Sequence, residues 1–366
     1  MRRLLPYVLG LTAVILLGLF LFLLPGWPGS SSLPGTDLSR FHPSAVPTHV
    51  EALKAADAAA REKAATTLWQ IGAAARQATP ALLQAAKDAD PRVRAAAVKA
   101  LGRTGQETQD AVPALTEALR DDHAEVRAAA ATSLAETWRV ADKVRPGERP
   151  GASRPVTAPA GPGGQVRVLR GGNPREVVRL IPSYEALARK AVPLLKAALG
   201  DADARVRAAA AAALAETGPL AEPAVADLVQ ILLKDTDREA RLQATLALAH
   251  AGPAARAAVP VLVERLRAEK ADGVRVNTAV ALGMIRSSPQ TAVPALVETF
   301  LKDQHPDARS AAMRSIGQFG PEAKLAIPLL EAAKDPKNQL PENAVRNIDR
   351  LLQFLGAAAK DAADKK

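Results

Sequence analysis

The sequence reads Ala111-Val-Pro-Ala-Leu-Thr-Glu-Ala-Leu-Arg-Asp121 and, after a gap of three residues, Glu125-Val-Arg-Ala-Ala-Ala130. Its two landmarks are the proline at 113 and the arginine at 127. The first landmark or a near copy recurs at Pro47, Pro80, Pro113, Pro193, Ala226, Pro260, Pro294 and Pro328, and the second at Arg61, Arg94, Arg127, Arg207, Arg241, Arg275, Arg309 and Arg346. Successive landmarks are mostly 33 or 34 residues apart. A fixed period of this length indicates that one supersecondary unit is repeated along the chain.

Each unit has the pattern of two helices. Leu or Ile lies seven residues after the arginine, as at Leu68 and Leu101, and apolar residues around it follow the helical spacing of three and four. An Asp follows the first predicted helix. A glycine eleven residues after the arginine is expected to end the second helix, at Gly72, Gly105, Gly218, Gly252 and Gly320. Neither helix can bury its apolar stripe alone, so about eight consecutive pairs are expected to stack into one solenoid.

The units quoted above resemble HEAT repeats, in particular the short bacterial HEAT-like repeats of the phycobilisome-lyase type. The resemblance covers residues 45–356 and implies an all-α, right-handed α-solenoid. It also implies that the repeated Asp and Arg residues form a ladder of hydrogen bonds between the turns of stacked units, so these residues are expected to be structural. Arrays of this family mostly scaffold other proteins, and the second helices line their concave face.

Composition agrees with helices and excludes several chemistries. The chain has 366 residues, of which 48% are apolar and only 3% aromatic, and it has no cysteine. Close-packed helices rich in Ala and Leu are therefore expected in place of aromatic-rich sheets. The lack of cysteine excludes disulfides, thiolate metal sites and thiol nucleophiles.

The N-terminal segment predicts a membrane anchor. Arg2 and Arg3 precede an uncharged stretch at residues 4–24, which as a helix reaches about 31 Å, the thickness of a bilayer core. Residues 1–24 are thus predicted to be a transmembrane anchor, or a signal sequence, and 25–44 a flexible linker. The two arginines favour a cytoplasmic N-terminus with the bulk of the protein extracytoplasmic. Cleavage of a signal would instead give a secreted or periplasmic protein.

A long insertion interrupts the repeats. Repeats 1–3 are expected over 45–138, the insertion over 139–182, repeats 4–8 over 183–356 and a polar tail over 357–366. The insertion is rich in Pro, Gly and Arg, and its β-prone runs at 165–170 and 175–181 predict a small β-hairpin, after which Ser183 is expected to cap a helix. Its basic residues form a candidate contact patch of Arg145, Arg149, Arg154, Arg167, Arg170, Arg175 and Arg179. A functional loop and a disordered spacer both remain open for this segment.

No catalytic site is expected on the solenoid. The rows two and nine residues after each arginine are mainly alanine and isolated polar residues, so no group of ligands or titratable side chains converges. None of the five histidines is followed by Glu, unlike in the HEAT hydroxylases that bind iron through His-Glu motifs. No metal, cofactor or phosphate-binding loop is therefore predicted. Trp69 and Trp138 are expected to pack in the seam between units.

The leading functional hypothesis is a non-catalytic, membrane-anchored scaffold that binds another protein or a peptide on its concave face. The first alternative is a binder of nucleic acid, anionic lipid or acidic glycan through the basic insertion. The second is a bilin-lyase-like enzyme. The predicted topology and the lack of aromatic residues among the arginines disfavour nucleic acid, and no small-molecule substrate is evident. Of the net charge of +10, the two N-terminal arginines supply two and the insertion six, which leaves the solenoid nearly neutral.

Overall fold

Helices account for every regular element in the part of the chain that the computed structural model describes, which is residues 41–104, 111–142, 174–338 and 342–363. The described helices pair in sequence, from α2 with α3 to α16 with α17. The prediction of an all-α solenoid of stacked helices is thereby confirmed.

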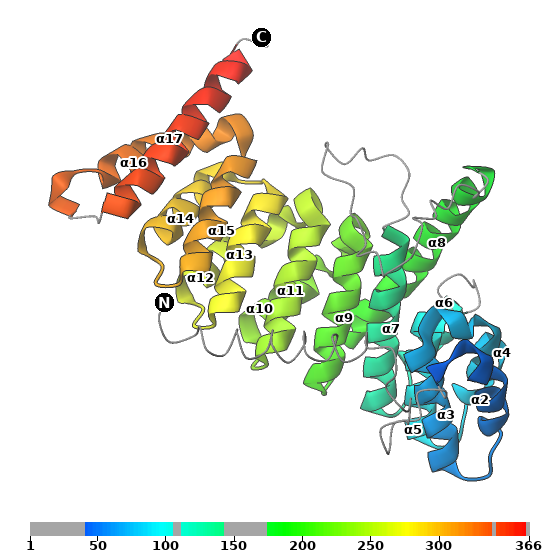
Figure 1. Cartoon of the computed structure of the whole chain (residues 1–366). Coiled ribbons are helices and arrows are strands. Elements are labelled where there is room, and N and C mark those ends of the chain that lie inside the picture. The colour runs from blue at the N-terminus through cyan, green and yellow to red at the C-terminus, as the bar shows by residue number, and fades with distance from the viewer. Residues whose placement is uncertain (1–40, 105–110, 143–173, 339–341, 364–366) are drawn as a thin grey trace, which may run out of the picture. The chain divides into compact units, whose positions relative to one another are not determined.

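The second helix of each repeat belongs to one layer, here called the second-helix layer. It consists of α3 (Ala58–Ile71), α5 (Pro91–Thr104), α7 (Ala124–Asp142), α9 (Ala204–Thr217), α11 (Arg238–Ala251), α13 (Asp272–Ile285) and α15 (Pro306–Gln318). Each of these helices packs directly on the next, and Figure 1 shows them in succession from α3 to α15. Most of the buried residues on the facing sides of these helices are alanine. Because the alanine side chain is small, the helices can approach one another closely.

The first helices form the other layer, the first-helix layer. It consists of α2 (Val46–Ala52), α4 (Thr79–Ala85), α6 (Ala111–Ala118), α8 (Pro174–Ala198), α10 (Val225–Lys234), α12 (Val259–Ala268), α14 (Pro289–Lys302) and α16 (Ala326–Ala333). The last helix is α17 (Glu342–Ala363), and short 3-10 helices occur at η2 (Pro43–Ala45), η3 (Gly72–Ala78), η4 (Gly218–Ala224), η5 (Gly252–Ala258), η6 (Gly320–Leu325) and η7 (Pro336–Asn338). The buried apolar residues between the layers form one cluster that runs from Val46 to Leu355. The core thus grows along the array, repeat by repeat.

The helix ends follow the predicted local signals. Asp57, Asp203 and Asp237 cap the starts of α3, α9 and α11 by accepting bonds from backbone N–H groups of the first turn. Four of the five predicted stop glycines have a positive φ of 57° to 70°, namely Gly72, Gly218, Gly252 and Gly320. Residues other than glycine rarely adopt this backbone conformation. The fifth, Gly105, lies outside the described residues.

The insertion is shorter than predicted, because both of its ends are helical. Helix α7 lacks a stop glycine at Trp138 and continues to Asp142, so that it has 19 residues where α5 and α9 have 14. The predicted β-hairpin is wrong in its second half, since residues 175–181 lie in α8, and Ser183 lies inside this helix instead of capping it. β-propensity is a weak preference, whereas an established helix extends at little cost by one hydrogen bond per residue.

The predicted anchor at residues 4–24 lies outside the described residues. Within them, one stretch, Arg238–Ala268, is long and apolar enough to span a membrane by length and composition alone. It comprises α11, η5 and α12, and half of its most apolar window is buried inside the solenoid. Ala255 also departs from helical geometry within it, so this stretch is part of the core of two repeats.

Candidate binding groove

An arginine ladder links the turns of successive repeats. In each rung the arginine near the start of a second helix donates Nε and Nη2 to both carboxylate oxygens of an acid in the next repeat. For Arg207 and Asp235 these two distances are 2.6 and 2.7 Å. The Nη1 group of Arg207 also donates to the carbonyl oxygens of Asp201 and Ala202 in its own turn, at 2.9 and 3.0 Å. One guanidinium therefore closes its own turn and holds the next one.

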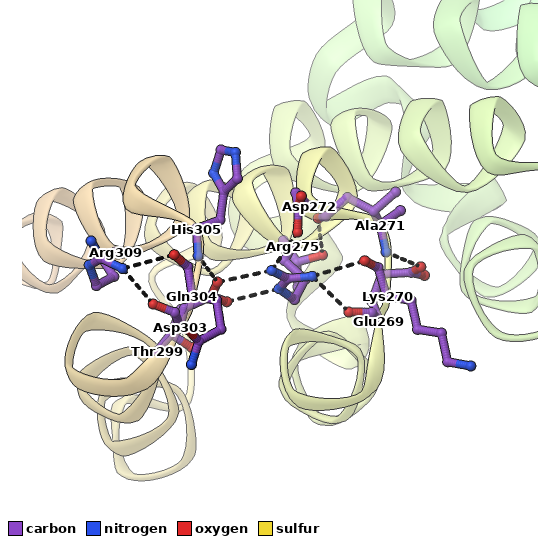
Figure 2. A network of polar contacts seen from close by, with 12 residues as sticks. Glu269, Lys270, Ala271, Asp272, Arg275, Thr299, Asp303, Gln304, His305 and Arg309 are labelled. Atoms are coloured by element: carbon purple, nitrogen blue, oxygen red, sulfur yellow. Dashed lines mark hydrogen bonds and ion pairs between the residues drawn. The ribbon is translucent and has the colours of Figure 1, made fainter.

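The ladder has six rungs among the described residues, as the resemblance to HEAT repeats implies. They are Arg61–Asp88, Arg94–Asp121, Arg127–Asp201, Arg207–Asp235, Arg241–Glu269 and Arg275–Asp303. Figure 2 shows the contacts around Arg275, which binds Asp303 of the next turn and the Glu269 carbonyl of its own. The Arg127–Asp201 rung joins the repeats on the two sides of the insertion, so the array continues without a break between α7 and α9.

One acid of the ladder, Glu269, is not among the turn acids predicted from the sequence. Glu269 stands where the other repeats have Asp, and only 4% of its side chain is exposed. It lies six residues before Arg275, the same offset that separates Asp88 from Arg94. Position, and not only residue type, could therefore have identified it.

The ladder lowers the pKa of each acid that it holds. In four rungs the main cause is the pair of hydrogen bonds from the arginine, namely at Asp88, Asp201, Asp235 and Asp303. For Asp121 and Glu269 the largest influence is burial, which raises the pKa. Bonds from the arginine and from a backbone N–H together outweigh it, so the pKa is still lowered. These acids are ionised structural partners and offer no proton for chemistry near neutral pH.

A groove of about 510 Å³ lies on the second-helix layer of the first repeats. Its lining comes from α3, α5 and α7 and from the first turn of α9: Glu62, Thr66, Trp69, Arg92, Ala96, Lys99, Glu125, Ala128, Ala129, Thr132, Ser133, Glu136 and Arg205. Small residues of α5 and α7 supply the apolar part of this lining, whereas the rest is mostly charged or polar. The groove therefore combines an apolar surface with a polar surround, as binding sites on proteins commonly do.

Only part of the charge in the groove is neutralised by neighbouring side chains. Arg92 and Arg205 bind Asp90 and Asp203, at 2.9 and 2.7 Å. Four other charged groups of the lining form no hydrogen bond or ion pair with any described residue: Glu62, Lys99, Glu125 and Glu136. The lining therefore has three carboxylates and one ammonium group without a hydrogen bond or ion pair, and two of these carboxylates, Glu62 and Glu125, act electrostatically on Arg92 and Arg205.

The two tryptophans of the repeats have different environments. Trp138 is fully buried, as the sequence predicts, and its indole N–H has no hydrogen-bond partner among the described residues. Trp69 packs partly on the core, as expected for a residue in the seam between repeats, but its exposed part also lines the groove. The guanidinium of Arg103 lies 5.0 Å from the Trp69 ring centre, within range of a cation–π contact that holds the ring in place.

The two rows predicted to form the exposed face of the second helices, two and nine residues after each arginine, include part of the groove lining, at Ala96, Ala129 and Glu136. The row two positions after the arginine is mixed, because Ala96 and Ala129 are 8% and 2% exposed whereas Lys63 is on the exposed side. The exposed row lies three positions later, at Thr66, Lys99 and Thr132. Its polar residue types were a signal for the correct helix phase.

The predicted basic patch is largely untested by the structure. Arg145, Arg149, Arg154, Arg167 and Arg170 lie outside the described residues, and Arg175 and Arg179 lie in the first turns of α8. Within the described part of the chain, no group of three or more His, Asp or Glu side chains is placed to hold a metal ion.

The paired layers, the ladder and the open groove define this protein as a helical-repeat scaffold. The chain belongs to the HEAT repeat family, whose model matches residues 46–135, 174–249 and 259–349. Solenoids of the HEAT and armadillo type typically bind proteins. No curated protein sequence matches the chain.

Two solved structures with TM-scores of 0.50 or more show the same fold at low sequence identity, and a third with a lower TM-score is also similar. The Escherichia coli protein YibA is 16% identical, with a TM-score of 0.51 over 89% of this chain and 99% of its own. A chain from work on a phosphorylation switch that controls the interaction between cadherin and β-catenin is 15% identical, with a TM-score of 0.50 over 87% of this chain and 63% of its own. A chain from the complex of CpcE and CpcF of phycocyanin lyase from Nostoc sp. PCC7120 is 22% identical, with a TM-score of 0.37 over 56% of this chain and 98% of its own.

Proposed function

We propose that this protein is a non-catalytic scaffold that binds another protein or a peptide on its second-helix layer, with the groove over α3, α5 and α7 as the main contact. The observation that carries this proposal is Trp69, a partly exposed aromatic side chain held by Arg103 beside an apolar lining. Tryptophan and arginine are the residue types that dominate binding energy at protein interfaces. The ladder supports the proposal, because it holds neighbouring helices in a fixed arrangement and so reduces the cost of ordering on binding.

The proposal includes attachment to a membrane through residues 4–24, with Arg2 and Arg3 in the cytoplasm and the solenoid on the other side. Its support is the length of the uncharged stretch and the placement of the two arginines before it. The proposal also states that the repeats are of the short bacterial type found in phycobilisome lyases. In this chain they serve binding and not lyase chemistry.

Site-specific photo-crosslinking tests the binding surface. A photoreactive amino acid at Thr132, which is exposed in the groove, is expected to capture a discrete protein partner in cells that produce the full chain. The matched control position is Glu117, which is exposed on α6, the first helix of the same repeat. Adducts at Glu117 in place of Thr132, or no adduct at Thr132 at native abundance, would contradict binding on the second-helix layer.

Cysteine labelling tests the topology. Because the chain has no cysteine, one cysteine introduced at the exposed Gln84 is its only thiol. A membrane-impermeant maleimide added to intact cells, after removal of any outer membrane, is expected to label the Gln84→Cys chain in the membrane fraction. Labelling only after the membrane is lysed would show a cytoplasmic solenoid, and a soluble labelled chain would indicate cleavage.

Polyanion binding through the insertion remains the second candidate, because this segment carries most of the excess positive charge. Replacement of residues 143–173 by a Gly-Ser linker of equal length leaves α7 and α8 intact. If the second candidate holds, the wild-type chain binds heparin with an affinity that falls steeply with salt, and the replacement abolishes binding. Capture of a partner at Thr132 that survives the same replacement would favour the groove instead.

A further inference from the structure

The groove has a local charge opposite to that of the whole chain. The lining charges without a hydrogen bond or ion pair are three carboxylates and one ammonium, because Arg92 and Arg205 are bound to Asp90 and Asp203. These two arginines also attract Glu62 and Glu125, at longer range than a hydrogen bond. The chain as a whole has a formal net charge of +10. Attraction to the protein as a whole would therefore favour an acidic ligand, and only the groove itself would favour a basic one.

The carboxylates of Glu62 and Glu136 are only partly exposed, yet no described residue donates a hydrogen bond to either. Arg92 attracts Glu62 at longer range, but a partly buried carboxylate that accepts no hydrogen bond is still costly, and a cationic ligand group that donates one lowers this cost. Glu125 on α7 adds a third acceptor at an exposed position. Glu62 belongs to α3 and the other two carboxylates to α7, the helices that pack on either side of α5 with its Ala96.

We propose that the groove over α3, α5 and α7 binds a peptide segment in which an apolar side chain packs against Trp69 while lysine or arginine side chains pair with Glu62, Glu125 and Glu136. This inference rests on the proposed function and specifies the chemistry of its partner. Complementary charge sets the specificity, and the apolar contact with Trp69 supplies affinity.

Lys99 adds a restriction on the ligand. Its ammonium group belongs to α5, which lies between the helices that bear the three carboxylates. A cation placed directly over Lys99 is repelled, and such like-charge contacts exclude wrong partners. The basic residues of the ligand are therefore expected to flank a residue that is apolar or acidic, and an uninterrupted run of lysines is disfavoured.

Selection from a library of random twelve-residue peptides tests this inference. The full-length chain, immobilised in detergent, is expected to enrich peptides that combine lysine or arginine with an aromatic or large aliphatic residue. The triple variant Glu62→Gln, Glu125→Gln, Glu136→Gln is expected to lose this basic preference and to bind the enriched peptides at least about tenfold more weakly, as measured by fluorescence anisotropy. Trp69→Ala is expected to weaken the binding of the same peptides, and Trp69→Phe is expected to weaken it less.

The control is a second triple variant, Glu117→Gln, Glu222→Gln, Glu264→Gln, which changes the net charge equally at exposed positions away from the groove. It is expected to bind the peptides as the wild-type chain does, and circular dichroism checks that all variants are folded. Enriched peptides without a basic excess, or equal effects of the two triple variants, would overturn the inference.

Failure of this inference and failure of the proposed function can be told apart. A partner captured at Thr132 together with peptides that lack a basic preference leaves the scaffold function standing and removes only the charge rule. If no peptide is enriched and no adduct forms at Thr132, both the scaffold function and the charge rule are contradicted.

Discussion

At the scale of single residues, the ladder depends on the shape of the arginine side chain. A guanidinium has five N–H groups in one plane. Arg207 uses them to bind two carbonyl oxygens of its own turn and both oxygens of Asp235 in the next. An ammonium group has the charge but not this planar fork. The same residue type therefore recurs in the first six ladder positions, while the acid varies between Asp and Glu.

Two arginines of one helix give a matched pair for measuring the ladder. Arg207→Ala leaves the carboxylate of Asp235, only 3% exposed, without its partner, and we expect a loss of about 3 kcal/mol of unfolding free energy. Arg205→Ala, two residues away, removes an ion pair whose arginine is 72% exposed, and we expect a much smaller loss because water screens such a pair. Urea unfolding followed by circular dichroism measures both, and similar losses would show that the ladder adds little.

At the scale of helices, the spacing within the second-helix layer depends on small residues at the contacts. A Cβ atom built on Gly102 of α5 would lie 2.6 Å from the Cβ of Ser133 and 2.9 Å from its Cα on α7. The hydroxyl of Ser133 donates to the carbonyl of Val98 at 3.0 Å, which binds the two helices at the same place. Any larger residue at position 102 must push α5 and α7 apart.

Glycine-to-alanine substitutions test this close contact. We expect Gly102→Ala to lower the unfolding free energy by about 1 to 3 kcal/mol, because neighbouring backbone must move. Gly356→Ala in α17 is the control, since a Cβ there meets nothing within 4 Å and alanine favours a helix by up to about 1 kcal/mol. Thermal unfolding is expected to shift in opposite directions for the two variants, and a stabilised Gly102→Ala chain would refute the packing account.

At the scale of the whole described solenoid, the rungs link each repeat to the next from α3 to the turn before α15. Six carboxylates in succession have a lowered pKa, and all lie at contacts between repeats. Protonation of any of them weakens one contact in the array. Because repeat proteins are stabilised by contacts between neighbours, the effect of acid is distributed along the solenoid.

This arrangement predicts that acid destabilises the protein. The pKa of each ladder acid is lower in the folded chain than in the unfolded chain, so its contribution is complete above the ordinary value near 4. The contribution is lost as the pH falls through the lowered value. The acids Asp90 and Asp203 beside the ladder have a pKa of about 2. We therefore expect the unfolding free energy to fall between about pH 4 and pH 2.

Urea unfolding at a series of pH values measures this dependence, with Asp235→Asn as the comparison. That variant is expected to be less stable near neutral pH and to lose less of its remaining stability in acid, because one of the six groups can no longer be protonated. An unfolding free energy that stays constant from pH 6 to pH 3 would contradict the prediction.

Features set within one repeat could be predicted from the sequence. The helix pairs, the stop glycines such as Gly218 and the pattern of turn acids depend on residues less than one repeat apart, and they occur where the periodicity places them. The hairpin at 175–181 was wrong because short β-prone runs carry little information unless their pairing partner is known. The predicted rows include part of the groove lining, as at Ala129 and Glu136. The exposed row that contains Thr66 and Lys99 was missed, although its polar residue types indicate the helix phase.

The family, the repeat length and the positions of the ladder arginines follow from the sequence alone, because they depend on a pattern that recurs in every repeat. The pairing of the ladder depends on tertiary structure, because each ladder arginine binds an acid 27 or more residues away. Tertiary structure also brings Glu62, Trp69, Lys99 and Glu136 together on one surface from three helices. Local hydrogen bonds and periodicity set the helices, whereas contacts between repeats set the groove and its charge.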